Sequence, residues 1–395
     1  MTDKLPPVLT SLTLYAGNVY EDAKTILPLA KVGNVYRPSK PKKPGCCTVL
    51  GDTVVVWNTQ LGIGVDEDDY MDGSDNTLAP LTLSLFADDS LQCRIVLDDI
   101  GYDETRYINA YADYALHEDT HRWSECLFKL PGNHLYSIYK TLNRNGGRVD
   151  LSDGRARRVR IEVVDDKGNV STSEFVVKPA LNYTPPAPPP NSHLFRVGYE
   201  NKISDPNINF MLDARQLYDD VNFVFSKRTG RNPWSDTFLL HDSRVPLHHH
   251  FDLQVKPGKP IPFALRNKVV LMHADGDDVE GYAALPAGEG RFLVKTRNLG
   301  KYWLDIDTVP PVIRALQASA NYSKSFQITL SAKDDATSVR RFSGYIDGKW
   351  VCFEQHGSTF FYKFDTHCPK GKHQLVFEAT DENGNTAKLK LDFVR

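Results

Sequence analysis

Residues 381–385 read Asp381-Glu382-Asn383-Gly384-Asn385, and the chain continues as Thr386-Ala387-Lys388-Leu389-Lys390-Leu391-Asp392-Phe393. A strand-like run from Gln374 to Ala379 precedes this stretch. Gly and Asn supply the positive φ that a tight hairpin turn needs, and alternating apolar and polar side chains are typical of a half-buried strand. The stretch therefore predicts a β-hairpin at the end of a β-rich module.

The same ending occurs once earlier in the chain. Asp165-Asp166-Lys167-Gly168-Asn169 follows the run Val159 to Val163 and precedes the alternating run Val170 to Val177. The beginnings match as well, since Leu5-Pro6-Pro7-Val8 resembles Val309-Pro310-Pro311-Val312. Proline cannot donate to a β-ladder, so Pro-Pro suits a linker that passes into an edge strand. The repeat predicts two modules with the same first and last strands.

A proline-rich run supplies the clearest boundary. Residues 182–191 read Asn-Tyr-Thr-Pro-Pro-Ala-Pro-Pro-Pro-Asn, which is typical of a semi-rigid linker. We therefore predict an immunoglobulin-like β-sandwich at 5–178, a linker at 179–192, a second all-β sandwich at 193–306 and a C-terminal immunoglobulin-like module at 307–395. The first module has few helix breakers between Thr105 and Leu116, so a partly helical insertion is expected at about 103–126. The predicted fold class is all-β, with tandem immunoglobulin-like β-sandwich modules.

Composition limits the function classes. The 395 residues suit about two to four domains, and 41% hydrophobic and 25% charged residues are ordinary for globular protein. A formal net charge of −3 gives no electrostatic route to nucleic acid or an anionic membrane. No window approaches the roughly 18 apolar residues of a membrane span. Met1-Thr2-Asp3-Lys4 begins no signal peptide, so we expect the sequence to open in mid-protein.

The six cysteines form no metal-binding pattern. Cys46 and Cys47 are adjacent, whereas Cys93 and Cys126 are isolated in apolar runs. Only Cys352 and Cys368 lie in one small module, where a disulfide would be compatible with their spacing. The alternative is that all six are mostly buried thiols.

Residues His117-Glu118-Asp119-Thr120-His121 fit the H-E-x-x-H pattern. On a helix the two histidines would share a face and hold zinc, with Glu118 activating water. The surrounding residues are polar and no third ligand stands at a recognised spacing downstream. We therefore favour a solvated loop or helix face over a zinc site.

Two other histidine groups resemble fragments of metal sites. His248-His249-His250 contains an H-x-H, which on a strand would place two rings on one face. His273 and Asp277 have the H-x-x-x-D spacing. We favour a surface strand before Phe251 for the first group, rather than a metal centre.

An acidic cluster comprises Asp66-Glu67-Asp68-Asp69 together with Asp72 and Asp75. A calcium loop beginning at Asp68 would put Tyr70 at an oxygen-ligand position and Ala79 at the position of the bidentate Glu. The cluster is therefore no EF-hand. A solvated turn is favoured, with a weak cation site between strands as the alternative.

Several stretches resemble one known family, and they are Gly62-Ile63-Gly64-Val65-Asp66, Asp69-Tyr70-Met71-Asp72-Gly73, Asp103-Glu104-Thr105-Arg106-Tyr107-Ile108-Asn109 and Leu127-Phe128-Lys129-Leu130-Pro131-Gly132-Asn133. They look like the region downstream of the peptidase domain in Bacteroides-type lysostaphin-like (LytM-type) zinc metallopeptidases. The likeness covers essentially the whole chain and is strongest over 60–178 and at Asp307 to Pro311. Members of that family resemble peptidoglycan endopeptidases in which an N-terminal peptidase domain precedes several β-sandwich modules.

The resemblance implies no catalytic residue here. The family uses H-x-x-x-D followed by H-x-H, whereas His273 and Asp277 come after His248-His249-His250. No catalytic, cofactor-binding or metal residue is carried over, and no cofactor is expected. The resemblance implies a non-catalytic accessory region that positions or regulates an upstream or separate peptidase domain, or binds peptidoglycan or another envelope protein. It also implies a periplasmic or cell-envelope location.

Two alternatives remain open. The chain is an independent peptidoglycan- or carbohydrate-binding module if exposed Trp57, Trp234 or Trp350 stack on sugars, although tryptophan is more often a core residue. It is a zinc metallopeptidase if His117, Glu118 and His121 bind the metal. An upstream peptidase reading frame, retention on insoluble peptidoglycan and stoichiometric zinc would distinguish the three hypotheses.

Overall fold

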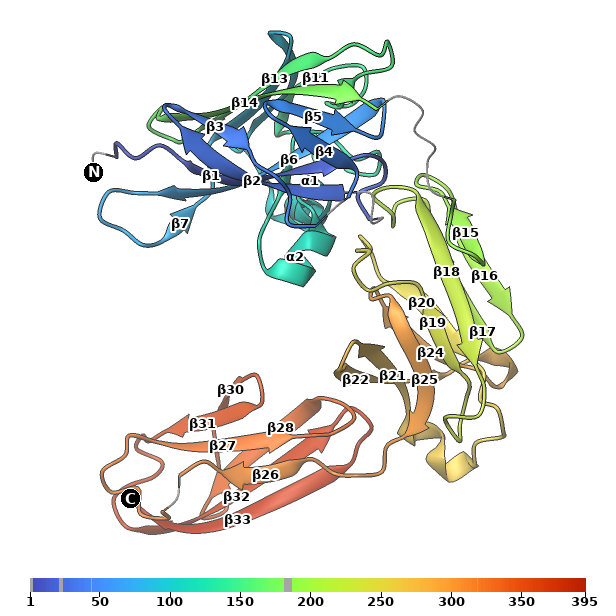
Figure 1. Cartoon of the computed structure of the whole chain (residues 1–395). Helices are drawn as coiled ribbons and strands as arrows, with labels where there is room; N and C mark the ends of the chain where they lie inside the picture. Colours follow the sequence, from blue (N-terminus) through green and yellow to red (C-terminus); the bar gives the residue numbers. More distant parts are fainter. Residues whose placement is uncertain (1–2, 21–23, 44, 181–186, 318) are drawn as a thin grey trace.

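The computed structural model describes residues 3–20, 24–43, 45–180, 187–317 and 319–395 (Figure 1). Three successive hydrophobic cores lie along the chain, between Leu9 and Val177, between Phe195 and Leu304, and between Tyr322 and Phe393. The molecule is all-β and consists of tandem immunoglobulin-like modules. None of the helices in the described ranges has the length and hydrophobicity needed to cross a bilayer.

Module 1, which contains β1 to β14, is built around a continuous 14-stranded sheet with the path β10-β6-β1-β2-β3-β14-β13-β8-β9-β11. The strands are β1 (Val8–Tyr15), β2 (Lys24–Val32), β3 (Val35–Pro38), β4 (Cys47–Leu50), β5 (Thr53–Val56), β6 (Gln60–Tyr70), β7 (Thr77–Leu78), β8 (Thr82–Ala87), β9 (Ser90–Val96), β10 (Glu125–Cys126), β11 (Tyr139–Leu142), β12 (Val149–Asp150), β13 (Arg157–Val164) and β14 (Val170–Pro179). The sheet encloses the first core.

The helical insertion lies between β9 and β10. It contains η1 (Tyr102–Tyr107), α1 (Ile108–Tyr111) and α2 (Tyr114–Thr120). Asp113 caps the N-terminus of α2, where its carboxylate accepts a hydrogen bond from the Leu116 amide at 3.0 Å. The same buried carboxylate accepts a hydrogen bond from Tyr15 at 2.9 Å and forms an ion pair with Lys24 at 2.8 Å. These contacts fasten the insertion to β1 and β2, and β10 returns the chain to the sheet beside β6.

Module 2 contains β15 to β25 in two antiparallel sheets, with the orders β15-β18-β19-β25-β21-β22 and β16-β17-β20-β24-β23. The elements are β15 (Ser192–Phe195), β16 (Asn201–Asp205), β17 (Ile208–Leu212), β18 (Val221–Arg228), β19 (Thr237–Leu240), β20 (Phe251–Val255), η2 (Phe263–Lys268), β21 (Val269–Asp275), β22 (Asp278–Ala283), β23 (Leu285–Pro286), η3 (Gly288–Gly290), β24 (Phe292–Thr296) and β25 (Gly300–Ile306). The predicted linker at 179–192 includes residues 181–186, which lie outside the described ranges.

Module 3 contains β26 to β33, again in two antiparallel sheets, with the orders β26-β27-β31-β30 and β29-β28-β32-β33. Its strands are β26 (Val312–Ala315), β27 (Gln327–Lys333), β28 (Val339–Ile346), β29 (Lys349–Val351), β30 (Glu354–His356), β31 (Thr359–Lys363), β32 (Lys372–Asp381) and β33 (Thr386–Val394). Alternate side chains of β27 and β32 enter the core between the sheets.

The two predicted hairpins are confirmed. β13 pairs with β14 up to Val164 and Val170, and β32 pairs with β33 up to Thr380 and Thr386. Gly168 and Gly384 have φ angles of 87° and 77°, so each turn needs a residue that tolerates the left-handed region. Buried alternate residues fix the register, because a slip by one residue would expose them.

Candidate functional site: the module junctions

Aromatic rings join module 1 to module 2. Tyr107, at the end of η1, stacks on His248 with 4.3 Å between the ring centroids. The His248 Nδ1 atom lies 2.8 Å from the Tyr218 hydroxyl, and that hydroxyl donates to the Arg106 carbonyl at 3.3 Å. Arg106 in turn donates to the Leu247 carbonyl at 2.9 Å. The insertion of module 1 is thereby hydrogen-bonded to the loop before β20.

A small hydrophobic cluster crosses the same junction. Tyr218 of module 2 packs in it with side chains of module 1 that include Tyr15, Phe128 and Leu130. The Gly132 amide donates to the Tyr218 carbonyl at 2.9 Å. A Cβ atom on Gly132 would lie 2.2 Å from the Leu217 carbonyl oxygen, so only glycine permits this approach of the two backbones. An Arg244–Asp119 ion pair at 3.2 Å adds a contact from α2.

The H-E-x-x-H segment occupies this contacting helix. Glu118 and His121 are exposed, and His121 lies just beyond α2 in the left-handed conformation. The His117 ring stacks on Trp123 at 3.7 Å, so its face is covered by an indole. Burial leaves the His117 Nδ1 atom without a hydrogen-bond partner. The segment thus forms the exposed end of a short helix.

The strand predicted for His248-His249-His250 is wrong. These residues form a bend before β20, because the Gln216 side chain donates to the carbonyls of His249 and His250. Burial is the main cause that lowers the His248 pKa to about 4. The geometry assigns His248 to the junction, while the rings of the triplet do not share a strand face.

His273 and Asp277 also separate. His273 is buried in β21, where its Nε2 atom lies 2.9 Å from the Leu299 carbonyl and its Nδ1 atom 3.3 Å from Glu280. Asp277 lies exposed in the turn between β21 and β22. His273 is therefore a hydrogen-bonded core residue.

The solvated turn predicted for Asp66 to Asp69 is wrong, whereas Asp72 and Asp75 do lie exposed beyond the strand. The four residues belong to β6, since β6 pairs with β1 as far as Val8 and Asp68, and Asp69 pairs with Leu78 of β7. Asp66 forms an ion pair with Arg122 at 2.7 Å. Burial first, and then the neighbouring carboxyl of Glu125, raise the Glu67 pKa to about 9.

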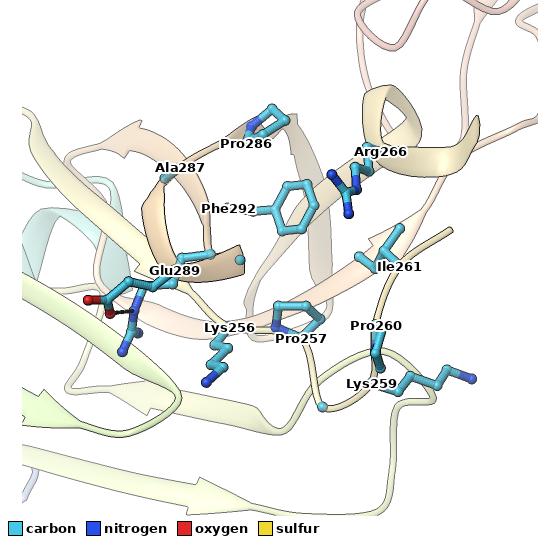
Figure 2. A pocket seen from close by; sticks show the side chains of 13 residues that line it. Lys256, Pro257, Lys259, Pro260, Ile261, Arg266, Pro286, Ala287, Glu289 and Phe292 are labelled. Carbon is cyan, nitrogen blue, oxygen red and sulfur yellow. Dashed lines mark ion pairs between the residues drawn. The ribbon is translucent and has the colours of Figure 1, made fainter. Parts of the chain in front are cut away.

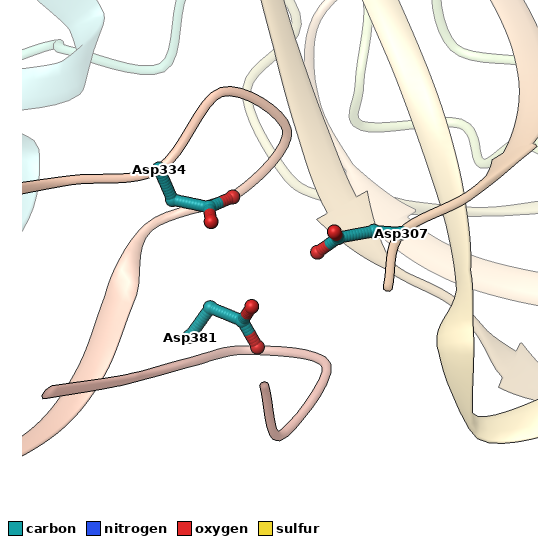
Figure 3. Close-up of side chains that lie close together, drawn as sticks. All are labelled: Asp307, Asp334 and Asp381. Carbon is teal, nitrogen blue, oxygen red and sulfur yellow. The ribbon is translucent and has the colours of Figure 1, made fainter. Parts of the chain in front are cut away.

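The junction between modules 2 and 3 contains a triad of carboxylates, Asp307, Asp334 and Asp381 (Figure 3). Asp307 lies in the connection after β25, Asp334 follows β27 and Asp381 ends β32. One ligand oxygen from each lies within 4.8 Å of the others. Within the residues that the structure describes, this is the only group of three or more His, Cys, Asp or Glu side chains placed to share an ion.

Polar contacts surround the triad. Lys268 of module 2 donates to the Asn383 carbonyl at 2.9 Å and to the Asn385 side chain at 2.5 Å. The side-chain amide of Asn385 donates hydrogen bonds to the Asp307 carbonyl at 3.3 Å and to the Asp381 carboxylate at 2.8 Å. A Cβ atom on Gly281 of β22 would lie 2.3 Å from the Ala336 carbonyl, so the two modules are in close backbone contact.

The sequence repeat contains a signal for this triad beyond its turns and prolines. Asp3 and Asp307 each stand three residues before Pro-Pro. Each side chain accepts from the amide two residues later, at 3.1 Å from Leu5 and 3.0 Å from Val309. The backbone carbonyl of each aspartate also accepts a hydrogen bond of 3.3 Å from the side chain of the asparagine that ends the Asp-x-x-Gly-Asn turn of its module, Asn169 or Asn385. The module repeat therefore includes the aspartate before the first strand, a residue that the sequence-based predictions did not single out.

A shallow pocket of about 590 Å³ lies in module 2, beside the loop after β20 (Figure 2). Its charged lining comprises Lys256, Lys259, Arg266, Arg291 and Glu289, and Glu289 lies 3.9 Å from Arg291. The described lining contains no serine, cysteine or histidine. The pocket is basic, and its described lining offers no Ser–His or Cys–His pair.

The tryptophans and cysteines differ in exposure. Trp57 and Trp234 are half-buried, and Lys259 lies 4.3 Å above the Trp234 ring. Trp350 is 61% exposed. Cys352 and Cys368 are both free thiols, the first exposed and the second buried, so the structure does not form the disulfide that their spacing would permit.

Comparisons with known proteins give one family match and several distantly similar structures. Residues 192–307, which span β15 to β25, match the Zu5-like domain family. Similar solved structures include a Bacteroides ovatus protein of the mixed-linkage glucan utilization locus, SGBP-B, in complex with a heptasaccharide, at 11% identity, with 100% of this chain and 71% of that chain covered and a TM-score of 0.16. The human desmocollin-1 ectodomain matches at 12% identity, with 88% and 69% covered and a TM-score of 0.18. No curated protein matches the sequence.

The fold and the junctions define a class of protein. The chain is a string of immunoglobulin-like β-modules connected through contacts between their ends. Its second module carries the Zu5-like match.

Proposed function

We propose that the chain is a non-catalytic scaffold of the cell envelope that holds its modules in a fixed order for an associated LytM-type peptidoglycan peptidase. One observation carries the proposal: each histidine-containing group that suggested catalysis has a residue that takes part in packing or in a contact between modules. His248 is held between Tyr107 and Tyr218, and His273 is bonded inside module 2. Asp119, within the H-E-x-x-H segment, pairs with Arg244 across the junction.

The peptidase association is supported by the sequence resemblance over 60–178 and at the Asp307 to Pro311 junction. The peptidase domain belongs upstream in the same protein or on a separate chain, and the modules position it on its substrate. A periplasmic or envelope location follows from this assignment.

Zinc content and hydrolysis together test the proposal. The purified chain is supplied with zinc and incubated with peptidoglycan beside the His117→Ala/His121→Ala double variant. We expect neither protein to hold stoichiometric zinc or release muropeptides. Zinc-dependent hydrolysis that the double variant loses would overturn the proposal and establish a metallopeptidase. An increase in the activity of a LytM-type peptidase on adding the chain would support the accessory role.

Glycan binding is a second candidate function, favoured by one pair of aromatic side chains. Trp350 of β29 lies opposite Tyr345 of β28, so the two side chains share a sheet face. Exposed aromatic rings stack on the apolar faces of sugars. Co-sedimentation with insoluble peptidoglycan, comparing Trp350→Ala with Tyr102→Ala, tests this candidate. Tyr102 is 98% exposed but lies in module 1. Equal retention of both variants would exclude a role for Trp350.

A further inference from the structure

We propose that Asp307, Asp334 and Asp381 bind a calcium ion that connects module 2 to module 3. The assignment rests on the geometry of the junction and is independent of any peptidase association. Oxygens that contact one calcium ion at about 2.3–2.6 Å lie no more than about 5 Å apart. The three ligand oxygens lie within 4.8 Å of one another, as this coordination requires.

Asp307 supplies a separate observation that points to a ligand. The residue is 4% exposed, and its Oδ2 atom has no hydrogen-bond partner although it is buried. Its Oδ1 atom already accepts from the Val309 amide. Figure 3 shows the Asp307 carboxylate directed towards those of Asp334 and Asp381. A buried carboxylate oxygen without a donor is costly, and a cation between the three groups removes that cost.

The other two carboxylates are held in place by their own loops. The Asp334 carboxylate accepts a hydrogen bond from the backbone amide of Thr337 at 2.7 Å, and the Asp381 carboxylate accepts one from the backbone amide of Asn385 at 2.8 Å. These bonds leave further lone pairs on each carboxylate. Lys268, the nearby cation, donates hydrogen bonds to Asn383 and Asn385. The loops therefore preorganise the oxygens for a ligand.

The donor set selects the kind of cation. All three groups are carboxylates, which are the hard oxygen ligands that calcium prefers. Zinc sites of proteins usually include histidine or cysteine, and neither belongs to this group. Calcium also tolerates irregular coordination completed by backbone oxygens and water, whereas magnesium demands near-ideal octahedral geometry.

The ion would control how the two modules are held together. Asp307 belongs to the connection leaving β25, while in module 3 Asp334 follows β27 and Asp381 is the last residue of β32. Without a cation, the negative charges of Asp307, Asp334 and Asp381 lie side by side at the junction. The same charges repel one another and favour separation of the connection from the module. Calcium reverses that repulsion and makes the junction stiffer.

Calcium binding to the full chain, measured by equilibrium dialysis with excess magnesium, tests the site. The variants Asp307→Asn and Asp334→Asn are compared with Asp335→Asn, which removes one charge from the adjacent exposed position. We expect Asp307→Asn and Asp334→Asn to hold one calcium ion fewer per chain than the wild type and Asp335→Asn. Absence of calcium from the wild type, or equal calcium on all four proteins, would overturn the proposal.

Solution scattering supplies an independent measurement. Calcium should narrow the distribution of interatomic distances for the wild type and Asp335→Asn relative to chelator, and leave Asp334→Asn unchanged. Because Asp→Asn removes repulsion, both site variants should unfold in chelator at or above the wild-type temperature, which checks that they fold. If calcium changed the distribution of interatomic distances equally in Asp334→Asn and in the wild type, the proposed role of the ion between modules 2 and 3 would be contradicted.

Discussion

The imidazole ring of His248 in module 2 lies flat against the phenol ring of Tyr107 in module 1, with an angle of 23° between their planes. The Tyr218 hydroxyl holds the Nδ1 atom of the same histidine. One side chain therefore contacts both modules through different chemistry, and its protonation state affects the junction.

Acid is expected to weaken this junction. Burial first, then His249 and nearby cations including Arg106, lower the His248 pKa from 6.5 to about 4. The separated state therefore binds the proton more tightly, so the contribution of His248 is complete above pH 6.5 and is lost as the pH falls towards 4. Solution scattering between these pH values should show the junction opening. His248→Gln should reduce the pH dependence, and an unchanged dependence would contradict the assignment.

Gly132→Ala should destabilise the contact between modules 1 and 2. The added Cβ would meet the Leu217 carbonyl at 2.2 Å, and this backbone atom cannot move aside as a side chain would. We expect a loss of about 1–3 kcal/mol in the free energy of unfolding, measured with urea. Gly17→Ala is the control, since a Cβ atom added there would have no neighbour within 4 Å. Equal stability of the two variants would refute the close contact.

Glu67→Gln should stabilise module 1 at alkaline pH. Burial first, and then nearby carboxylates such as Glu125 and Asp69, raise the Glu67 pKa from 4.5 to about 9. The folded state consequently holds a proton that the unfolded state has released, and stability falls as the pH rises from 4.5 towards 9. Urea unfolding from pH 5 to about 9 should show a smaller decline for Glu67→Gln. Glu118→Gln, at an exposed position, should match the wild type.

Asn385→Ala should destabilise module 3 by about 1–3 kcal/mol, because it removes the side-chain hydrogen bonds to the Asp307 carbonyl and to the Oδ2 atom of Asp381, while the backbone amide of residue 385 still donates to Asp381 Oδ1. Asn209→Ala changes an exposed residue of β17 and should have little effect. Thermal unfolding of the two variants measures the difference. A loss confined to Asn209→Ala would contradict the role assigned to Asn385.

Local sequence predicted local structure well. The Asp-x-x-Gly-Asn turns and the alternation after them specify both hairpins, because each hairpin is formed by neighbouring residues. The scarcity of helix-breaking residues between Thr105 and Leu116 likewise predicted helical structure there, and the insertion does contain short helices. These features depend on interactions a few residues apart.

Long-range packing decided the features that sequence could not predict. His248 lies in a bend because Gln216, from another part of module 2, bonds to the neighbouring carbonyls. The acidic residues of β6 belong to a strand because β1 and β7 pair with them. Asp307 and Asp381 meet only when the last hairpin folds against the connection from module 2, although the aspartate before Pro-Pro was visible in the repeat.

The bond from Asn385 to the Asp307 carbonyl also determines how module 3 carries mechanical load. Asp307 is held at the turn end of the β32–β33 hairpin, while Arg395 exchanges hydrogen bonds with Gly371 at the opposite end. Tension between Asp307 and Arg395 therefore acts along the strands. This pull runs parallel to β33, so it does not separate the hydrogen bonds between β32 and β33 one after another, as a pull directed across the two strands would.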